Sequence, residues 1–283
     1  MPEFAIVCGI LVHLNQNEMK HLLALMALSW ICSSVFSQED CELNYDGNGD
    51  GVVNVVDILG VLAEFGLDCW DDVSACQGQE AINFFGENYP LIEVESQCWF
   101  SRNLKSAQYA NGDSIVSGLT NEQWTTVGEG AFFSYAESFG QEPDESCLVQ
   151  FEIGHLYNGF AVLDERELCP SGFHVAGVAD WETLISNTGG EFMAGHNLKA
   201  SPDNVIPWNG SNSYGFNALF GHSRSGSTGN YNCSSNYPRG YYWTSTETGV
   251  NQMQYYLFWE ELFTVESDDT EKSVGYAVRC IKD

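Results

Sequence analysis

The sequence predicts an α+β domain of short antiparallel strands with long loops, preceded by a small calcium-loop unit. Short apolar and aromatic runs are separated by Gly, Asn, Asp and Ser, a pattern typical of strands joined by turns. Strands and helices do not alternate, so a parallel sheet is not expected. We expect strands at 91–94, 97–100, 132–135, 241–244, 255–259 and 276–280, and helices at 122–126 and 179–186.

The first residues indicate export from the cell. Met19 and Lys20 precede an apolar run at 22–35, and small residues follow before Gln38, which is the pattern of a secretory signal. The run is too short to span a membrane. We expect residues 1–18 to precede the true start and residues 19–37 to be a signal peptide. The mature protein would then be secreted and extracellular, or associated with the cell surface.

Residues 46–57 have the spacing of an EF-hand calcium loop. Oxygen-bearing side chains fall at loop positions 1, 3, 5, 9 and 12, and Gly51 allows the sharp turn at position 6. Position 7 would contribute its backbone carbonyl. The expected calcium ligands are therefore Asp46, Asn48, Asp50, Val52, Asn54 and Asp57. The alternative is a polar turn that binds no ion, because turns favour the same residue types.

This loop resembles one half of a bacterial dockerin, which implies calcium as a cofactor. A full dockerin has two such loops and only one is found here, so the support for a cohesin-type partner is weak. After the loop, apolar residues between 55 and 65 recur at helical spacing. A Cys41–Cys69 disulfide would bracket the unit and contribute about 3–4 kcal/mol. We expect a calcium-binding mini-domain at 38–70, a linker at 71–75 and a second domain at 76–283.

The composition argues against two classes of partner. The chain has 39 acidic residues and 10 Lys and Arg, for a net charge of −29. Nucleic acids and anionic membrane surfaces attract basic proteins, so neither is expected to bind. Hydrophobic residues make up 44% of the chain and aromatic residues 13%, which is too many for a disordered acidic segment.

The second domain contains an ordered series of short motifs. They include Gln97-Cys98-Trp99-Phe100, Asn103-Leu104, Tyr109-Ala110-Asn111-Gly112-Asp113, Leu156-Tyr157-Asn158, Leu168-Cys169-Pro170-Ser171-Gly172-Phe173-His174-Val175, Leu198-Lys199-Ala200, Tyr242-Trp243-Thr244-Ser245 and Val278-Arg279-Cys280. Over about residues 76–283 the series resembles the Fibrobacter succinogenes major paralogous domain. That family occurs in secreted and surface-exposed bacterial proteins.

The resemblance implies a C-type-lectin-like core, with two helices on a small, looped antiparallel sheet. Removing residues 1–37 leaves eight cysteines, and spacing alone leaves 105 pairings open. The resemblance suggests a Cys169–Cys280 bridge in the core. It also suggests a Cys76–Cys98 staple, which leaves Cys147–Cys233 as the remaining pair.

Residues 208–242 are rich in Ser, Gly, Asn and Tyr, a mixture that recognition loops use. The expected ligand contacts in this segment are Tyr214, Tyr231, Tyr237 and Tyr241. The alternative is an ordinary surface loop. Other motif aromatics are expected in the core, namely Trp99, Tyr157, Trp181, Phe216 and Trp243. Arg279 is expected to be a buried or half-buried partner of a carboxylate.

The sequence shows no catalytic motif. His155, His174, His196 and His222 are scattered, and there is no metalloprotease motif or nucleophile elbow. We therefore expect a secreted, non-catalytic calcium-binding protein. Its large domain would serve binding or adhesion, with a polysaccharide or a cell-surface protein as the partner. The alternatives are an enzyme of the sulfatase-modifying-factor type, which needs a reactive cysteine pair, or a structural component of an extracellular matrix.

The mini-domain at 38–70 should depend on calcium for its folding, because so short a unit buries little apolar surface. Removal of calcium from the mature protein should reduce its helical circular dichroism and its resistance to proteases. If both are unchanged after chelation, the calcium hypothesis is wrong.

Overall fold

The computed structural model describes residues 4–7, 10–13, 74–134, 153–204, 206–221, 223–232 and 238–283. The chain divides into two units, residues 1–71 and 72–283. In the first unit the described residues form an antiparallel hairpin of β1 (Phe4–Val7) and β2 (Ile10–His13). The predicted calcium loop, the Cys41–Cys69 and Cys147–Cys233 pairs and Tyr237 lie outside the described residues.

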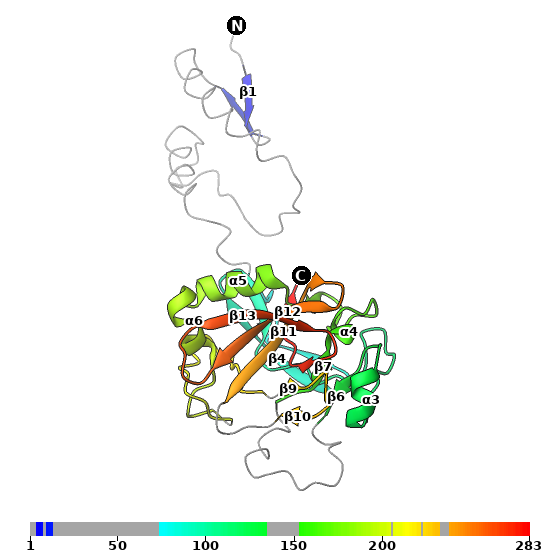
Figure 1. The fold of residues 1–283 in the computed structure, drawn as a ribbon. Helices are drawn as coiled ribbons and strands as arrows, with labels where there is room; N and C mark the ends of the chain where they lie inside the picture. The colour runs from blue at the N-terminus through cyan, green and yellow to red at the C-terminus, as the bar shows by residue number, and fades with distance from the viewer. Residues whose placement is uncertain are drawn as a thin grey trace. The chain divides into compact units, whose positions relative to one another are not determined.

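The second unit is an α+β domain whose strands form three sheets (Figure 1). One sheet has the order β3 (Ala81–Phe84), β4 (Glu87–Val94), β5 (Gln97–Phe100), β15 (Cys280–Lys282) and β8 (Phe173–Val175). A second has the order β10 (Tyr231–Asn232), β9 (Ser223–Arg224), β14 (Gly275–Tyr276), β7 (Leu156–Asn158) and β6 (Phe132–Phe133). The third consists of β11 (Arg239–Gly249), β12 (Gln252–Trp259) and β13 (Val265–Glu271). Neighbouring strands pair antiparallel in all three sheets, as expected.

The four helices of the described domain are short: α3 (Asn121–Thr126), α4 (Gly159–Val162), α5 (Val178–Asn187) and α6 (Gly190–Leu198). α3 and α5 confirm the two expected helices to within a residue at either end. α3 begins with a capping box between Thr120 and Gln123. Within the described residues, no helix is long and apolar enough to cross a membrane.

The sequence did not predict α6, because two of its nine residues after the cap are glycines and glycine is a poor helix former. The fold requires one of them. A Cβ on Gly195 would collide with the carbonyl oxygen of Thr264, so the helix packs directly against the backbone that leads into β13. Tertiary packing therefore outweighs the local preference here.

The predicted strand at 276–280 is wrong as a single element. The chain forms β14 at Gly275–Tyr276 and resumes as β15 at Cys280–Lys282, in a different sheet. Residues 277–279 cross between the two sheets. Arg279 lies in this crossing, between the end of β14 and the start of β15.

The core contains the motif aromatics predicted for it. Trp99, Tyr157, Trp181, Phe216 and Trp243 are all fully buried. Trp181, on α5, is central to one cluster. Its ring lies 5.5 Å from Trp99, 5.7 Å from Phe216 and 5.1 Å from Tyr256, so it joins the helix to two sheets. Offset and edge-on ring contacts of this kind add to the free energy of burial.

Two of the expected disulfides are present in the described residues. Cys169–Cys280 links the segment before β8 to β15, and Cys76–Cys98 fixes the start of the domain to β5. The first bridge spans 111 residues. By the chain-entropy estimate, a loop of this length contributes about 4–5 kcal/mol.

Arg279 is fully buried, but the prediction of a carboxylate partner is wrong. Nε donates to Asn103 Oδ1 at 2.6 Å, and Nη1 donates to the carbonyl oxygens of Phe100 and Phe216 at 2.8 and 2.7 Å. Nη2 donates to the carbonyl oxygen of Asn217 at 2.9 Å. These neutral oxygens belong to the end of β5, to Asn103 and to residues 216–217, so hydrogen bonds replace an ion pair. Burial lowers the pKa of Arg279 to about 10.

Replacement of Arg279 by Met should leave four buried oxygens without a donor. We expect Arg279→Met to lower the free energy of unfolding by about 3–5 kcal/mol. Urea unfolding followed by tryptophan fluorescence would measure it. The control is Arg102→Met, which removes a partly exposed ion pair to Glu87 and should cost less than about 1 kcal/mol. Equal losses in the two variants would contradict the role assigned to Arg279.

Candidate functional site

The predicted tyrosine contacts lie in different parts of the domain. Tyr214 packs against the cluster around Trp181. Tyr231 stacks on Phe133 with ring centroids 5.1 Å apart, and Tyr241 stacks on Tyr276 at 4.8 Å. The three described tyrosines thus belong to three different core clusters. A small surface pocket in the described residues lies next to Pro238 and Trp259, at the end of the predicted recognition segment.

This site is built on a buried lysine. Lys199 follows α6, and its side chain is fully buried. Nζ donates to the carbonyl oxygens of Trp259 at 2.9 Å, Glu260 at 3.1 Å and Leu262 at 2.9 Å. These three bonds use all three N–H donors of the ammonium group. Burial lowers the pKa of Lys199 to about 8, so the side chain is charged at neutral pH.

The three bonds shape residues 259–263, which run from the last residue of β12 toward β13. Three of its carbonyl oxygens point inward at one cation, so the side chains of the segment are carried on a folded turn rather than on a free loop. Asn209 donates to the Glu260 carbonyl oxygen as well. The ammonium also lies 5.2 Å from the ring centroid of the buried Trp208. We call residues 259–263 the Lys199 loop.

The outer side of the Lys199 loop forms a small surface pocket. Its lining residues are Pro238, Trp259, Glu260 and Glu261, and we call it the Trp259 pocket. Trp259 is half-buried and its position is fixed twice. The guanidinium carbon of Arg239, opposite Trp259 in the β11–β12 pair, lies 3.7 Å from the ring centroid. The indole N–H donates to Glu266 Oε2 at 2.8 Å.

The Trp259 pocket combines groups suited to a hydroxyl-rich ligand. An indole ring offers an apolar, polarisable surface, while carboxylates accept hydrogen bonds from hydroxyl groups. The sequence predicts Trp259 at the end of a strand, and no motif marks Glu260 or Glu261. The sequence does contain a Trp-Glu-Glu run at the end of an apolar strand. It does not show that Lys199 donates hydrogen bonds to the backbone of this run.

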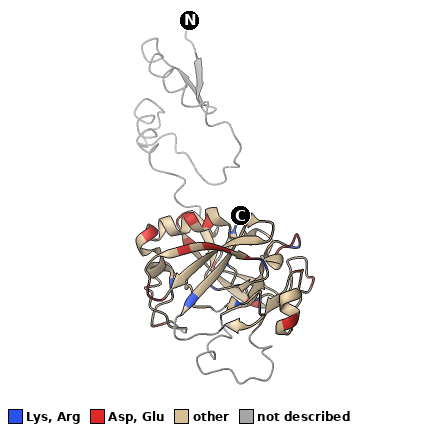
Figure 2. Cartoon of the chain, viewed as in Figure 1, with Lys and Arg blue, Asp and Glu red and all other residues tan. Residues whose placement is uncertain are grey.

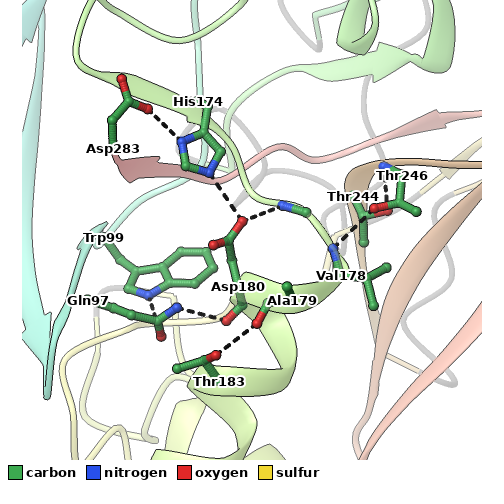
Figure 3. A network of polar contacts seen from close by, with 11 residues as sticks. Gln97, Trp99, His174, Val178, Ala179, Asp180, Thr183, Thr244, Thr246 and Asp283 are labelled. Atoms are coloured by element: carbon green, nitrogen blue, oxygen red, sulfur yellow. Dashed lines mark hydrogen bonds and ion pairs between the residues drawn. The ribbon is translucent and has the colours of Figure 1, made fainter.

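A separate polar network surrounds His174 at the start of α5 (Figure 3). Nδ1 of His174 lies 2.7 Å from Asp283 Oδ1, and Nε2 lies 3.2 Å from Asp180 Oδ2. The same Asp180 oxygen accepts the backbone N–H of Gly177 at 2.8 Å and so caps the helix. Gln97 donates to the Asp180 carbonyl oxygen at 3.0 Å, which ties the first turn of α5 to β5.

This network is a structural clasp that joins β8, the first turn of α5 and Asp283. Both ring nitrogens face carboxylates, and these contacts, with the hydrogen bond to Asp180 the largest, raise the pKa of His174 to about 9. The imidazole is therefore protonated at neutral pH and cannot accept a proton. The pKa of Asp180 is lowered, mainly by its hydrogen bond to His174. The clasp holds residue 283 to α5.

Among the residues that the structure describes, no group of three or more His, Cys, Asp or Glu is placed to hold a metal ion. The calcium ligands predicted at 46–57 lie outside this set.

The comparison with protein families decides what kind of domain this is. The Fibrobacter succinogenes major domain matches residues 92–282, about two thirds of the chain. The chain belongs to this family. Neither a curated protein nor a solved structure matched the chain.

The matched range covers most of the second unit; β3, the first residues of β4, Cys76 and Asp283 lie outside it. Its matched range contains Arg279, Lys199, the Lys199 loop and the Cys169–Cys280 bridge. The Cys76–Cys98 bridge begins before the range and ends inside it. Asp283 of the clasp lies one residue beyond the range, and so the clasp fixes the end of the family domain.

The clasp predicts a pH-dependent contribution to stability. The pKa of His174 is raised from 6.5 to about 9, so its contribution is fully present below about pH 6.5 and is lost as pH rises through 9. His174→Gln should therefore lower the melting temperature more at about pH 6 than at about pH 10. The loss should be modest because the side chain is partly exposed.

Nuclear magnetic resonance of the His174 ring would measure its titration directly. In Asp283→Asn the pKa of His174 should fall, since one of its two carboxylate partners is neutral. A His174→Gln effect that is the same at both pH values would contradict the clasp.

Proposed function

We propose that this protein is a secreted, non-catalytic binding module whose family domain attaches to an extracellular polysaccharide through the Trp259 pocket. Disulfides persist in oxidising compartments outside the cytosol, and the two bridges of the described domain are consistent with such a location. A surface protein is the other class of partner that the sequence suggests, and it is an outcome of the test below.

The observation that carries the proposal is the fixed position of Trp259. An aromatic ring binds a sugar well when it loses little freedom on binding. Arg239 and Glu266 hold this indole in place, and the Lys199 loop holds the two neighbouring carboxylates. The pocket is therefore organised before any ligand arrives.

The charge of the pocket favours a neutral glycan. Glu260 and Glu261 line the pocket and Glu266 contacts the indole, while the whole chain carries a net charge of −29. Uronic acids and sulfated sugars would meet like charge, which opposes binding. Neutral chains such as β-glucans or xylans can donate hydroxyl hydrogen bonds to the carboxylates.

The C-type-lectin-like core and the calcium-stabilised mini-domain remain part of the proposal. Helices α5 and α6 beside small antiparallel sheets, and a disulfide that joins the segment before β8 to β15, support the first. The loop spacing at 46–57 supports the second. The absence of enzymatic activity is also proposed. Cys76, Cys98, Cys169 and Cys280 are all paired, so none of these four offers the reactive thiol that a sulfatase-modifying enzyme needs.

Replacement of Trp259 by Ala should weaken glycan binding by about 2 kcal/mol, or roughly thirtyfold, because it removes the central aromatic contact. Affinity electrophoresis in neutral β-glucan, xylan and polygalacturonate would measure it. We expect retardation by at least one neutral polymer and none by polygalacturonate.

Two further variants separate binding from folding. Glu261→Gln keeps the shape of an exposed side chain and should weaken binding with unchanged stability. Tyr241→Phe alters a predicted contact outside the pocket and should bind normally. The polysaccharide proposal is wrong if the wild-type protein ignores a broad glycan panel, or if Trp259→Ala binds as tightly as the wild type.

A further inference from the structure

The large apolar side chains that are exposed in the described domain are unevenly distributed. Six are exposed, and four of them come from two segments: Phe192 (76% exposed) and Met193 (39%) on α6, and Leu262 (37%) and Phe263 (51%) on the Lys199 loop. The other two, Phe85 and Val250, lie at hairpin turns. Single exposed apolar residues are ordinary, whereas a group of them marks an interaction surface.

The two segments are in direct contact. The backbone N–H of His196 on α6 donates to the carbonyl oxygen of Phe263 at 3.2 Å. The His196 ring also packs on the Phe263 ring, with centroids 4.8 Å apart. Gly195 allows this approach, because any side chain there would collide with Thr264. Phe192 is one helical turn before His196, so it lies on the same side of α6. We call Phe192, Met193, Leu262 and Phe263 the α6 patch.

The patch residues of the Lys199 loop, Leu262 and Phe263, are held by backbone hydrogen bonds. Lys199 bonds the carbonyl oxygen of Leu262, and α6 bonds that of Phe263. Two large apolar side chains are thus held toward solvent by backbone groups that are buried and paired. Among the described residues, both side chains stay open to solvent, with Leu262 37% and Phe263 51% exposed.

The surroundings of the patch are acidic. The stretch formed by α5, α6 and residues 259–271 contains no Lys or Arg. Figure 2 shows the acidic residues on the two helices and along β13. Together with the two of the Lys199 loop, the acidic residues of this stretch are Asp180, Glu182, Glu191, Glu260, Glu261, Glu266, Asp268, Asp269 and Glu271. Glu191 and Glu261 each directly precede a patch residue in the chain.

We propose that the α6 patch docks a segment of another protein that presents apolar side chains flanked by Lys or Arg. The apolar side chains would cover Phe192 and Phe263, and the basic ones would pair with the carboxylates around them. A second copy of this chain fits less well, because each copy would bring the same acidic rim to the contact. This docking is distinct from glycan binding at the Trp259 pocket and does not depend on it.

The probe for the test is a fluorescein-labelled helical peptide with Leu along one face and Lys along the other. Its matched control has Glu at every Lys position. Fluorescence anisotropy with the full mature protein at about 0.15 M salt, where long-range attraction is screened, should show binding of the Lys peptide only. The double variant Phe192→Ser/Phe263→Ser should weaken that binding by about tenfold or more.

Two control variants are matched to the patch. Phe85→Ser removes an exposed phenylalanine at the β3–β4 turn and should bind the Lys peptide normally. Trp259→Ala should also bind it normally, which separates this proposal from the glycan proposal. Circular dichroism would establish that the double variant is folded. If it is not, Glu191→Gln/Glu261→Gln, which alters only exposed carboxylates, should weaken binding and reduce its salt dependence.

Three results would overturn the proposal. The first is failure of the Lys peptide to bind the wild-type protein. The second is binding that survives both double variants unchanged, which would indicate attraction to the net charge alone. The third is a concentration-dependent dimer in light scattering that Phe192→Ser/Phe263→Ser abolishes, which would assign the patch to self-association.

Discussion

The fold depends on the burial of one cation, Arg279, without a compensating carboxylate. Its guanidinium joins three parts of the chain: the end of β5 with Asn103, the segment at 216–217, and the crossing from β14 to β15. The Cys169–Cys280 bridge lies at the next residue. Because a buried guanidinium is tolerated only when its donors are satisfied, these segments must all be in place together. Arg279 therefore couples the packing of two sheets to the position of the loop at 216–217.

Lys199 is bound in the same way as Arg279, in a part of the domain nearer the surface. It too is a buried cation held by carbonyl oxygens rather than by a carboxylate. Carboxylates are abundant in this chain, and the buried side chains of the described residues include no Asp or Glu, so backbone oxygens serve as the internal acceptors. The consequence is a loop whose backbone is directed inward and whose side chains are directed outward. Both proposed contact surfaces, the Trp259 pocket and the α6 patch, use side chains of this one loop. Two neighbouring partners could then be bound from a single rigid support, on a face whose acidic side chains also discourage self-association.

Much of the architecture was predictable because it rests on local patterns. The antiparallel pairing, helices α3 and α5, and the burial of Trp99, Trp181 and Trp243 follow from strand and helix periodicity and from aromatic content. β13 was missed, since Asp and Glu are rare in strands. It forms because β12 offers it a full ladder, and at a sheet edge its acidic side chains can face water. The predicted tyrosine contacts are a different case. Tyr231 and Tyr241 stack on core aromatics in separate clusters, and a role for them in ligand binding stays a prediction.

Residue types and their order were enough to predict the class of the domain, its family, its acidic character and, through the family resemblance, the pairing of Cys169 with Cys280. Each of these properties follows from the residue types and from their order along the chain. The partners of Arg279 and Lys199 are visible only in the three-dimensional packing, because all but one of their acceptors are backbone oxygens, which every residue carries and no sequence pattern distinguishes. The position of Trp259, and hence the proposed site, follows from those bonds.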